Sequence, residues 1–302
     1  MIVITGATGA LNGATAEHLL RTVPAAGIAV VARDPASARS FADRGVEVRR
    51  GDYADAASLP TAFAGADRLL LVSASDPGAD AVALHRAAVE AATEAGVGRI
   101  LYTSHQGAAP DSPFAPARDH AATEGILADS GIPWTALRNG FYLHSIDLLL
   151  GAWRETGVIR VPADGPVSWT SRADAAEGAA RILLQDAPAD GPVTLTASAA
   201  PTMAEVAELA SDVAGRPVRL EVVDAEDWIA GLVAVGTPAP VARFLLGLPL
   251  ESEAHHLGRA VRAVVARIHV VGHAVSSSSR SPSRSLGRRG DIVLAQMRTV
   301  LF

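Results

Sequence analysis

The 302-residue sequence contains neither cysteine nor lysine, and only 4% of its residues are aromatic. Without cysteine the chain has no disulfide bridges, no thiol nucleophile and no cysteine-ligated zinc. Without lysine, arginine is the only side chain with a permanent positive charge. No apolar run is long enough to span a bilayer, and no basic segment precedes the short first apolar run. We therefore expect a cytoplasmic protein without a signal peptide or a membrane partner.

What is present is typical of a globular enzyme. Hydrophobic residues make up 49% of the chain, which is enough for one large core or two smaller ones. The formal net charge of -6 argues against a nucleic-acid partner. We expect no metal.

The first turn of the chain carries the strongest motif. Residues 1–5 form a short apolar run, Gly6, Gly9 and Gly13 follow, and residues 14–20 have the pattern of a helix. Glycine permits backbone angles closed to other residues and lets the backbone approach a pyrophosphate, which the helix N-terminus stabilises. An ordinary glycine-rich turn is the alternative, but the position directly after a strand favours a dinucleotide site.

The end of the second apolar run, residues 28–32, predicts which dinucleotide is bound. An acidic residue at this point accepts a hydrogen bond from the ribose 2′-hydroxyl of NAD, whereas an arginine suits the 2′-phosphate of NADP. Arg33 comes first, and Asp34 is also placed to cap the helix that Pro35 begins. We expect NADPH, with NADH as the less favoured cofactor.

Short apolar segments alternate with helical ones along the first half of the chain. After the first strand, further strands are predicted at residues 28–32, 46–49, 68–72, 99–102 and 133–137. This alternation predicts an α/β fold with a doubly wound parallel sheet, a Rossmann fold. After residue 138 it loosens. We therefore divide the chain into a dinucleotide-binding core at 1–138 and a smaller mixed α/β lobe on the substrate side at 139–249.

Residues 250–302 differ in composition from the rest of the chain. Eight arginines there oppose three acidic residues, and residues 276–285 are a run of serine, arginine and proline. Such low-complexity sequence cannot bury a core, which favours a disordered tail. A metal- or nucleic-acid-binding tail is the alternative, because four of the nine histidines lie here.

Several short motifs occur in an order that resembles one family. They are Thr5-Gly-Ala-Thr-Gly9, Arg33-Asp-Pro, Gly51-Asp-Tyr53, Tyr102-Thr-Ser104, His120 with Glu124, Ser130-Gly-Ile, Leu137-Arg-Asn-Gly-Phe-Tyr142 and Ser171-Arg-Ala-Asp174. Up to about residue 247 the chain resembles the NmrA-like branch of atypical short-chain dehydrogenases, and within it the NADPH-dependent quinone reductases. The resemblance implies a Rossmann fold, NADPH without a flavin, and a quinone or similar small electrophile as hydride acceptor.

The resemblance also implies a set of cofactor-binding residues. They are Gly6, Thr8, Gly9, Ala10 and Leu11 at the pyrophosphate, Arg33 at the 2′-phosphate, Asp52 and Tyr53 at the adenine, and Ser73, Ala74, Ser75, Thr103 and Ser104 along the inner path. One position departs from the family pattern. The third glycine is expected at residue 12, where this chain has Asn12 followed by Gly13. Either helix packing is looser there, or Asn12 adopts the needed backbone angles.

The catalytic pair of ordinary short-chain dehydrogenases, a tyrosine with a lysine four residues on, is absent. Hydride addition to a quinone gives an anion that is already stabilised, so orientation and one donor suffice. His120 is the candidate for that donor, because an unperturbed imidazole titrates near neutral pH. A surface histidine at a helix start is the alternative. His105 is a weaker candidate, and His85 is predicted to be structural.

Residues after the sixth strand predict a pocket for a flat substrate. Asn139, Phe141, Tyr142 and Trp169 are the candidates, because flat ligands favour flat walls. Ordinary core packing is the alternative for Phe141 and Trp169. A homodimer is kept open as the assembly. Some members of the family bind the dinucleotide but do not oxidise or reduce it. A non-catalytic redox sensor of the NmrA type is therefore the alternative function.

Overall fold

The structure, a computed structural model, describes residues 1–74, 76 and 78–253. Ser75 of the expected cofactor site and residues 254–302 of the expected tail lie outside this part of the chain. Within the described residues, no helix combines the length and the apolar character needed to cross a bilayer.

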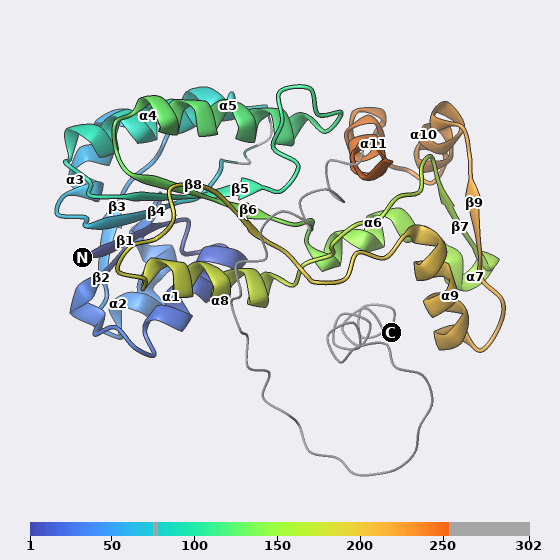
Figure 1. The fold of residues 1–302 in the computed structure, drawn as a ribbon, viewed down its shortest axis with the longest axis horizontal. Coiled ribbons are helices and arrows are strands. Elements are labelled where there is room, and N and C mark those ends of the chain that lie inside the picture. Colours follow the sequence, from blue (N-terminus) through green and yellow to red (C-terminus); the bar gives the residue numbers. More distant parts are fainter. Residues whose placement is uncertain (75, 77, 254–302) are drawn as a thin grey trace, which may run out of the picture.

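Seven strands form one parallel sheet in the order β3-β2-β1-β4-β5-β6-β8 (Figure 1). They are β1 (Ile2–Thr5), β2 (Ile28–Ala32), β3 (Glu47–Arg50), β4 (Arg68–Leu71), β5 (Ile100–His105), β6 (Trp134–Asn139) and β8 (Gly191–Leu195). Strands β2 and β5 are buried along their whole length, as expected of strands covered on both faces. The strand order reverses between β1 and β4, the place where open α/β sheets bind dinucleotides. The predicted Rossmann fold is confirmed.

Helices cover both faces of this sheet (Figure 1). On one face lie α1 (Ala10–Leu19), α2 (Arg39–Ala42) and α8 (Arg172–Leu183), and on the other lie α3 (Leu59–Phe63), α4 (Ala81–Glu94) and α5 (Ala115–Asp129). Short 3-10 helices at Ala25–Gly27, Pro35–Ala38, Ala56–Ser58 and Leu143–Ile146 occur in the connections. Each face encloses its own core of buried side chains, one around Phe63 and Tyr102 and the other around Leu19 and Phe41.

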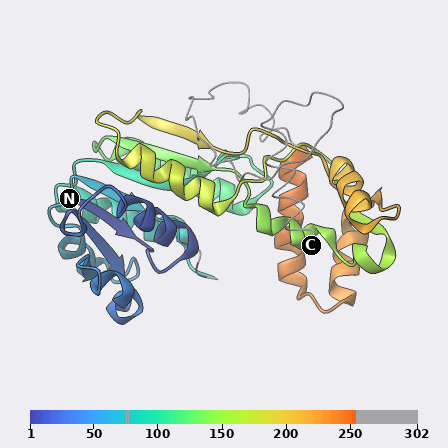
Figure 2. The ribbon, with the colours of Figure 1, turned by 90° about the horizontal axis from the view of Figure 1, so that it is seen from below.

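A smaller lobe lies beyond the carboxyl ends of β5 and β6 (Figure 2). It contains α6 (Asp147–Leu150), α7 (Trp153–Thr156), α9 (Met203–Ala214), α10 (Ala225–Ala234), α11 (Ala239–Glu253) and the parallel strand pair β7 (Val158–Val161) and β9 (Arg219–Val222). Its core includes the buried side chains of Trp153, Trp169 and Trp228. Phe114 and Phe141, which come from connections at the end of the sheet, belong to the same core and join the lobe to the sheet.

Three segments differ from what the sequence indicates. Although residues 139–249 are predicted to form the lobe, β8 pairs with β6 and α8 packs on α1, so both belong to the large sheet. Strand β8 begins with a glycine and a proline, which are uncommon inside strands, so its sequence does not indicate that it belongs to the sheet. The sequence also favours a loop with a short strand at residues 162–169, whereas the lobe strand β7 lies just before this segment and ends at Val161. Helix α11 continues through Pro249 to Glu253 and buries Glu251 completely, so the expected tail boundary falls inside a helix.

Candidate active site

The glycine turn after β1 leaves backbone room for a phosphate group. Gly6 has φ of +63°, and a Cβ atom there would lie 2.7 Å from Cγ1 of Val72 at the end of β4. Gly9 is the N-cap of α1 and provides no side chain to bond the first N–H groups of the helix. These N–H groups and the positive end of the helix dipole therefore remain for an anionic ligand. The turn fits the pyrophosphate of a dinucleotide.

The third glycine of the family motif is displaced by one residue, because Asn12 stands at the expected position and Gly13 follows it. A Cβ atom on Gly13 would lie 2.7 Å from the carbonyl oxygen of Ala7, so Gly13 permits the close packing of α1 against the turn. Asn12 lies inside α1, where its Nδ2 donates to the carbonyl of Thr5 across 2.8 Å. The looser packing considered from the sequence is not found. The amide of Asn12 instead ties the helix to the end of β1.

The predicted adenosine-binding residues follow β2 and β3. Arg33 is exposed, and its guanidinium lies 3.0 Å from the carboxylate of Asp76. Asp52 follows β3 and accepts a hydrogen bond from the N–H of Ala54. The hydroxyl of Tyr53 turns inward to the ends of β1 and β4, and its burial raises its pKa. Only the ring of Tyr53, and not its hydroxyl, is therefore available to a ligand.

Polar groups at the ends of β4 and β5 form the inner wall of the site. The N–H of Ser73 donates to the hydroxyl of Thr103 across 2.8 Å. Ser104 donates to the carboxylate of Glu124 across 2.6 Å, and Arg138 donates to both oxygens of that carboxylate. Arg138 and Glu124 therefore form an internal ion pair. It joins α5 to β6 and holds Ser104 in place.

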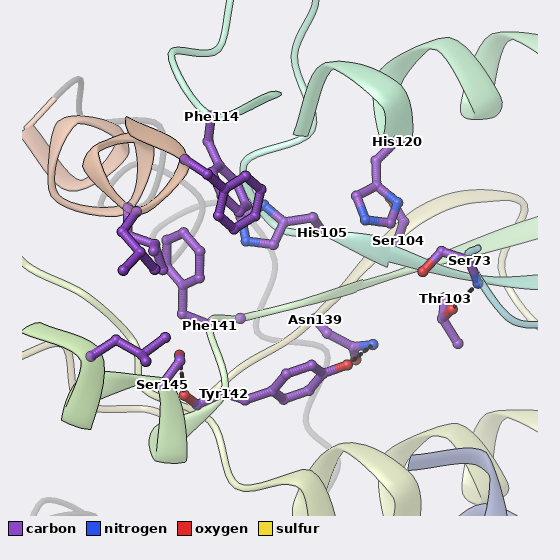
Figure 3. Close-up of a pocket in the computed structure, with 15 residues that line it drawn as sticks. Ser73, Thr103, Ser104, His105, Phe114, His120, Asn139, Phe141, Tyr142 and Ser145 are labelled. Atoms are coloured by element: carbon purple, nitrogen blue, oxygen red, sulfur yellow. Dashed lines mark hydrogen bonds between the residues drawn. The ribbon is translucent and has the colours of Figure 1, made fainter. Parts of the chain in front are cut away.

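A cavity of about 270 Å³ lies beyond this polar wall (Figure 3). Its lining residues are Ser73, Thr103, Ser104, His105, Phe114, His120, Asn139, Gly140, Phe141, Tyr142, Ser145, Leu148, Phe244, Leu245 and Leu248. The sheet side of the cavity is mainly polar, whereas α6 and α11 contribute apolar side chains. Such a shape, apolar with a few convergent polar groups, is typical of small-molecule sites.

The cavity brings together most of the predicted substrate residues. Asn139, Phe141 and Tyr142 line it, but Trp169 does not. Trp169 is only 1% exposed and packs behind Phe141, with ring centroids 6.0 Å apart, so it acts as core. The sequence did not reveal Phe114 or the residues of α11. The apolar spacing of 244, 245 and 248 is a signal for one helix face, but it does not say what that face contacts.

His120 lines the cavity from α5, and its environment differs from the one expected. Its Nδ1 lies 2.8 Å from the hydroxyl of Tyr102. Burial, together with His105, His85 and Arg138 nearby, lowers the pKa of His120 well below its ordinary value. The expectation of an imidazole that titrates near neutral pH is therefore wrong. The ring is neutral at pH 7 and cannot act there as an imidazolium acid.

His105 also lines the cavity, in closer contact with aromatic rings. Its Nδ1 accepts the N–H of Gly107 across 3.1 Å, and its ring meets Phe141 edge to face at a centroid distance of 4.6 Å. Burial lowers the pKa of His105 to about 4. Its Nε2 and Oδ1 of Asn139 are buried without a hydrogen-bond partner among the described residues. Two residues of the cavity lining thus each have a buried polar atom without a hydrogen-bond partner among the described residues.

A glycine turn at the switch point of a parallel sheet, followed by a partly polar cavity, defines a dinucleotide-binding protein of the Rossmann class. The sequence profile of the NmrA-like family matches residues 1–250. The chain belongs to the NmrA-like family, as the ordered motifs indicate.

Several relatives of known activity are similar over most of the chain. Quinone oxidoreductase 2 of Escherichia coli is 40% identical over 248 residues, which are 81% of this chain and 85% of the relative. The crystal structure of the E. coli NADPH-dependent quinone oxidoreductase with NADPH has a TM-score of 0.78 at 35% identity and covers 86% of this chain and 94% of its own. The triphenylmethane reductase of Citrobacter sp. with NADP(H) has a TM-score of 0.75 at 35% identity and covers 83% and 90%.

Proposed function

We propose that this protein is an NADPH-dependent reductase that passes a hydride to a quinone or a similar flat electrophile. The observation that carries the proposal is the cavity at the sheet end, which is lined by aromatic rings and by a few polar side chains. The relatives named as quinone oxidoreductase and as triphenylmethane reductase support the same reaction class.

The residues present fit NADPH. The turn at Gly6 and Gly9 would hold the pyrophosphate, Arg33 the 2′-phosphate, and the wall at Ser73 and Thr103 the inner part of the molecule. Bound there, NADPH supplies a hydride. The aromatic rings of the cavity orient a flat acceptor and exclude water, and proximity of this kind supplies much of the rate. No tyrosine–lysine pair is needed, because the acceptor ring stabilises the charge it gains.

The test is the loss of NADPH absorbance when benzoquinone is added to the unmutated protein. We expect turnover with NADPH and slower turnover with NADH. Tight binding of NADPH without oxidation by any of several quinones would reject the enzyme. That result would favour the non-catalytic redox sensor.

A further inference from the structure

A chain of buried hydrogen bonds runs behind the cavity from Ala74 toward His120. The backbone N–H of Ala74 donates to Nε2 of His85 across 2.7 Å. Because an amide N–H can only donate, Nε2 of His85 carries no hydrogen, and the hydrogen of the neutral ring is on Nδ1. This Nδ1 lies 2.7 Å from the hydroxyl of Thr123, which in turn donates to the carbonyl of Asp119 across 2.8 Å.

Tyr102 connects this chain to His120. Its hydroxyl lies 2.8 Å from Nδ1 of His120 and 3.4 Å from Nδ1 of His85. Nδ1 of His85 already carries a hydrogen and does not accept. The hydroxyl of Thr123 also bonds Tyr102 but already accepts from His85, so Nδ1 of His120 is the unoccupied acceptor for the tyrosine hydrogen. Burial raises the pKa of Tyr102, so the hydroxyl keeps its hydrogen at ordinary pH.

We infer that Tyr102 is a positioning residue, which holds His120 in the tautomer whose hydrogen is on Nε2 and thereby makes His120 a neutral hydrogen-bond donor to the substrate oxygen. With Nδ1 occupied by Tyr102, Nε2 is the ring nitrogen left for the cavity that His120 lines (Figure 3). This inference rests on the proposed function for the identity of the substrate. The tautomer itself does not depend on it.

The assignment changes the chemistry expected of His120. A quinone that gains a hydride, with NADPH oxidised to NADP⁺, becomes a hydroquinone monoanion. The Nε2–H of His120 stabilises the negative oxygen by a hydrogen bond and stays on the ring, while one proton from solvent completes the hydroquinone. A neutral imidazole N–H is suited to this, because a donor fixed in advance needs no reorganisation as charge develops.

The groups near His120 on β5, α4 and β6 favour the neutral ring. His105 on β5 stacks with it at a centroid distance of 6.2 Å, and Tyr102 on the same strand bonds it. His85 on α4 and Arg138 on β6 both act against a positive charge on the ring. The nearby carboxylate of Glu124 is already engaged by Arg138, and Asp119 precedes His120 on α5. Turnover should therefore show no titration of His120 between about pH 6.5 and 8.

The tautomer can be measured without turnover by ¹⁵N NMR of histidine-labelled protein. We expect His120 to show a hydrogen-bearing Nε2 and an accepting Nδ1 that do not change across this pH range. In the Tyr102→Phe variant the Nδ1 signal should lose its hydrogen-bonded character, and both tautomers should appear. Hydrogen on Nδ1 in the unmutated protein would overturn the inference, since Tyr102 would then accept from His120 and donate to Thr123.

Kinetics with benzoquinone provide a second test. His120→Leu should lower kcat by about 10²-fold, the scale of one lost oxyanion donor. His120→Gln, which restores an uncharged N–H donor, should stay within about tenfold of the unmutated protein. Equal loss in both variants would mean that His120 transfers a proton, and would overturn the inference.

Tyr102→Phe should lower kcat by about tenfold with little change in KM or NADPH affinity, because it removes only the positioning bond. Trp228→Phe is the matched control, since it removes a buried hydrogen bond to the carbonyl of Arg160 far from His120. An equal fall in kcat in both variants would indicate a merely structural role for Tyr102. If the unmutated protein is inactive but its NMR spectrum shows hydrogen on Nε2 of His120, the proposed function is rejected. The tautomer assignment is then still confirmed.

Discussion

The guanidinium of Arg33 donates a hydrogen bond to the carboxylate of Asp76 across 3.0 Å, from the end of β2 to the segment that follows β4. The two side chains are 68% and 52% exposed, so solvent weakens the pair. A 2′-phosphate bound by Arg33 would compete with Asp76 for the same nitrogen atoms. We therefore expect the choice between NADPH and NADH to depend on both residues.

The first prediction concerns Arg33→Ala. The variant should bind NADPH more weakly by about 1.5–3 kcal/mol, the scale of a charge-assisted hydrogen bond, and should bind NADH almost unchanged. Fluorescence titration with each nucleotide measures this. Arg39→Ala, on the nearby helix α2, is the control for loss of positive charge alone. Equal affinity of the unmutated protein for both nucleotides would contradict the assignment.

A second prediction follows for Asp76→Asn. Removing this carboxylate frees Arg33 and takes a negative charge away from the expected phosphate position. NADPH affinity should rise by a few fold, in line with about 0.2–1 kcal/mol for an exposed pair, and NADH affinity should not change. The same titrations at low and high salt should show that the gain is larger at low salt. An equal rise in NADH affinity would show that the gain does not come from contact between Arg33 and the 2′-phosphate.

Gly6→Ala should damage both the fold and the cofactor site. Residue 6 has φ of +63°, and its new methyl group would overlap Cγ1 of Val72. Gly65→Ala is the matched control, because Gly65 has φ of +71° but no atom within 4 Å of the added Cβ. Urea unfolding should show a loss of about 1 kcal/mol for Gly65→Ala, from backbone strain, and a larger loss for Gly6→Ala. Only Gly6→Ala should weaken NADPH.

The buried imidazoles predict sensitivity to acid. Burial lowers the pKa of His85 and of His105 to about 4, whereas an unfolded histidine titrates near 6.5. The unfolded chain therefore binds more protons below about pH 6.5, and the free energy of unfolding falls as pH drops toward about 4. Each histidine contributes a slope of up to about 1.4 kcal/mol per pH unit in this window. In urea titrations His105→Gln should show a shallower fall, and an unchanged slope would speak against a neutral buried His105.

The open side of the cavity should contact the extended part of larger substrates and lower their KM. Leu148 of α6 and Phe244 of α11 line it but remain about half exposed, at 49% and 50%. Phe244→Ala should raise KM for a naphthoquinone with an alkyl chain by a few fold and leave kcat unchanged, because only uniform binding is lost. KM for benzoquinone should change less. Val235→Ala, at an 81% exposed residue outside the cavity lining, is the control.

The sheet was predictable because its signals are local. Strands such as β1, β2 and β4 are short apolar runs followed by turns, and Gly6 begins the turn after β1. Strand β8 falls in the segment 139–249 that the sequence assigns to the lobe, since its five residues include Gly191 and Pro192 and its partner β6 is distant in sequence. Pairing between distant segments leaves no periodic signal in either segment.

The sequence predicted which residues form the site better than it predicted their packing and protonation. The order of motifs pointed to Asn139, Tyr142 and His120, which all line the cavity. Whether Trp169 faces the cavity or the core depends on which side of Phe141 it packs, and its neighbours in sequence do not fix this. The low pKa of His120 arises first from burial and then from side chains on three other elements, so no local pattern shows it.

The return of the chain to the sheet through α8 and β8 also bears on how the protein can be made. During synthesis β6 is complete about fifty residues before its neighbour β8 appears, and until then it presents an unpaired edge. A fragment that ends at residue 138 would keep this edge permanently and would lack the helix that packs on α1. Such a fragment should aggregate when expressed alone, so we expect the dinucleotide-binding part to fold only together with the later segment that contributes α8 and β8.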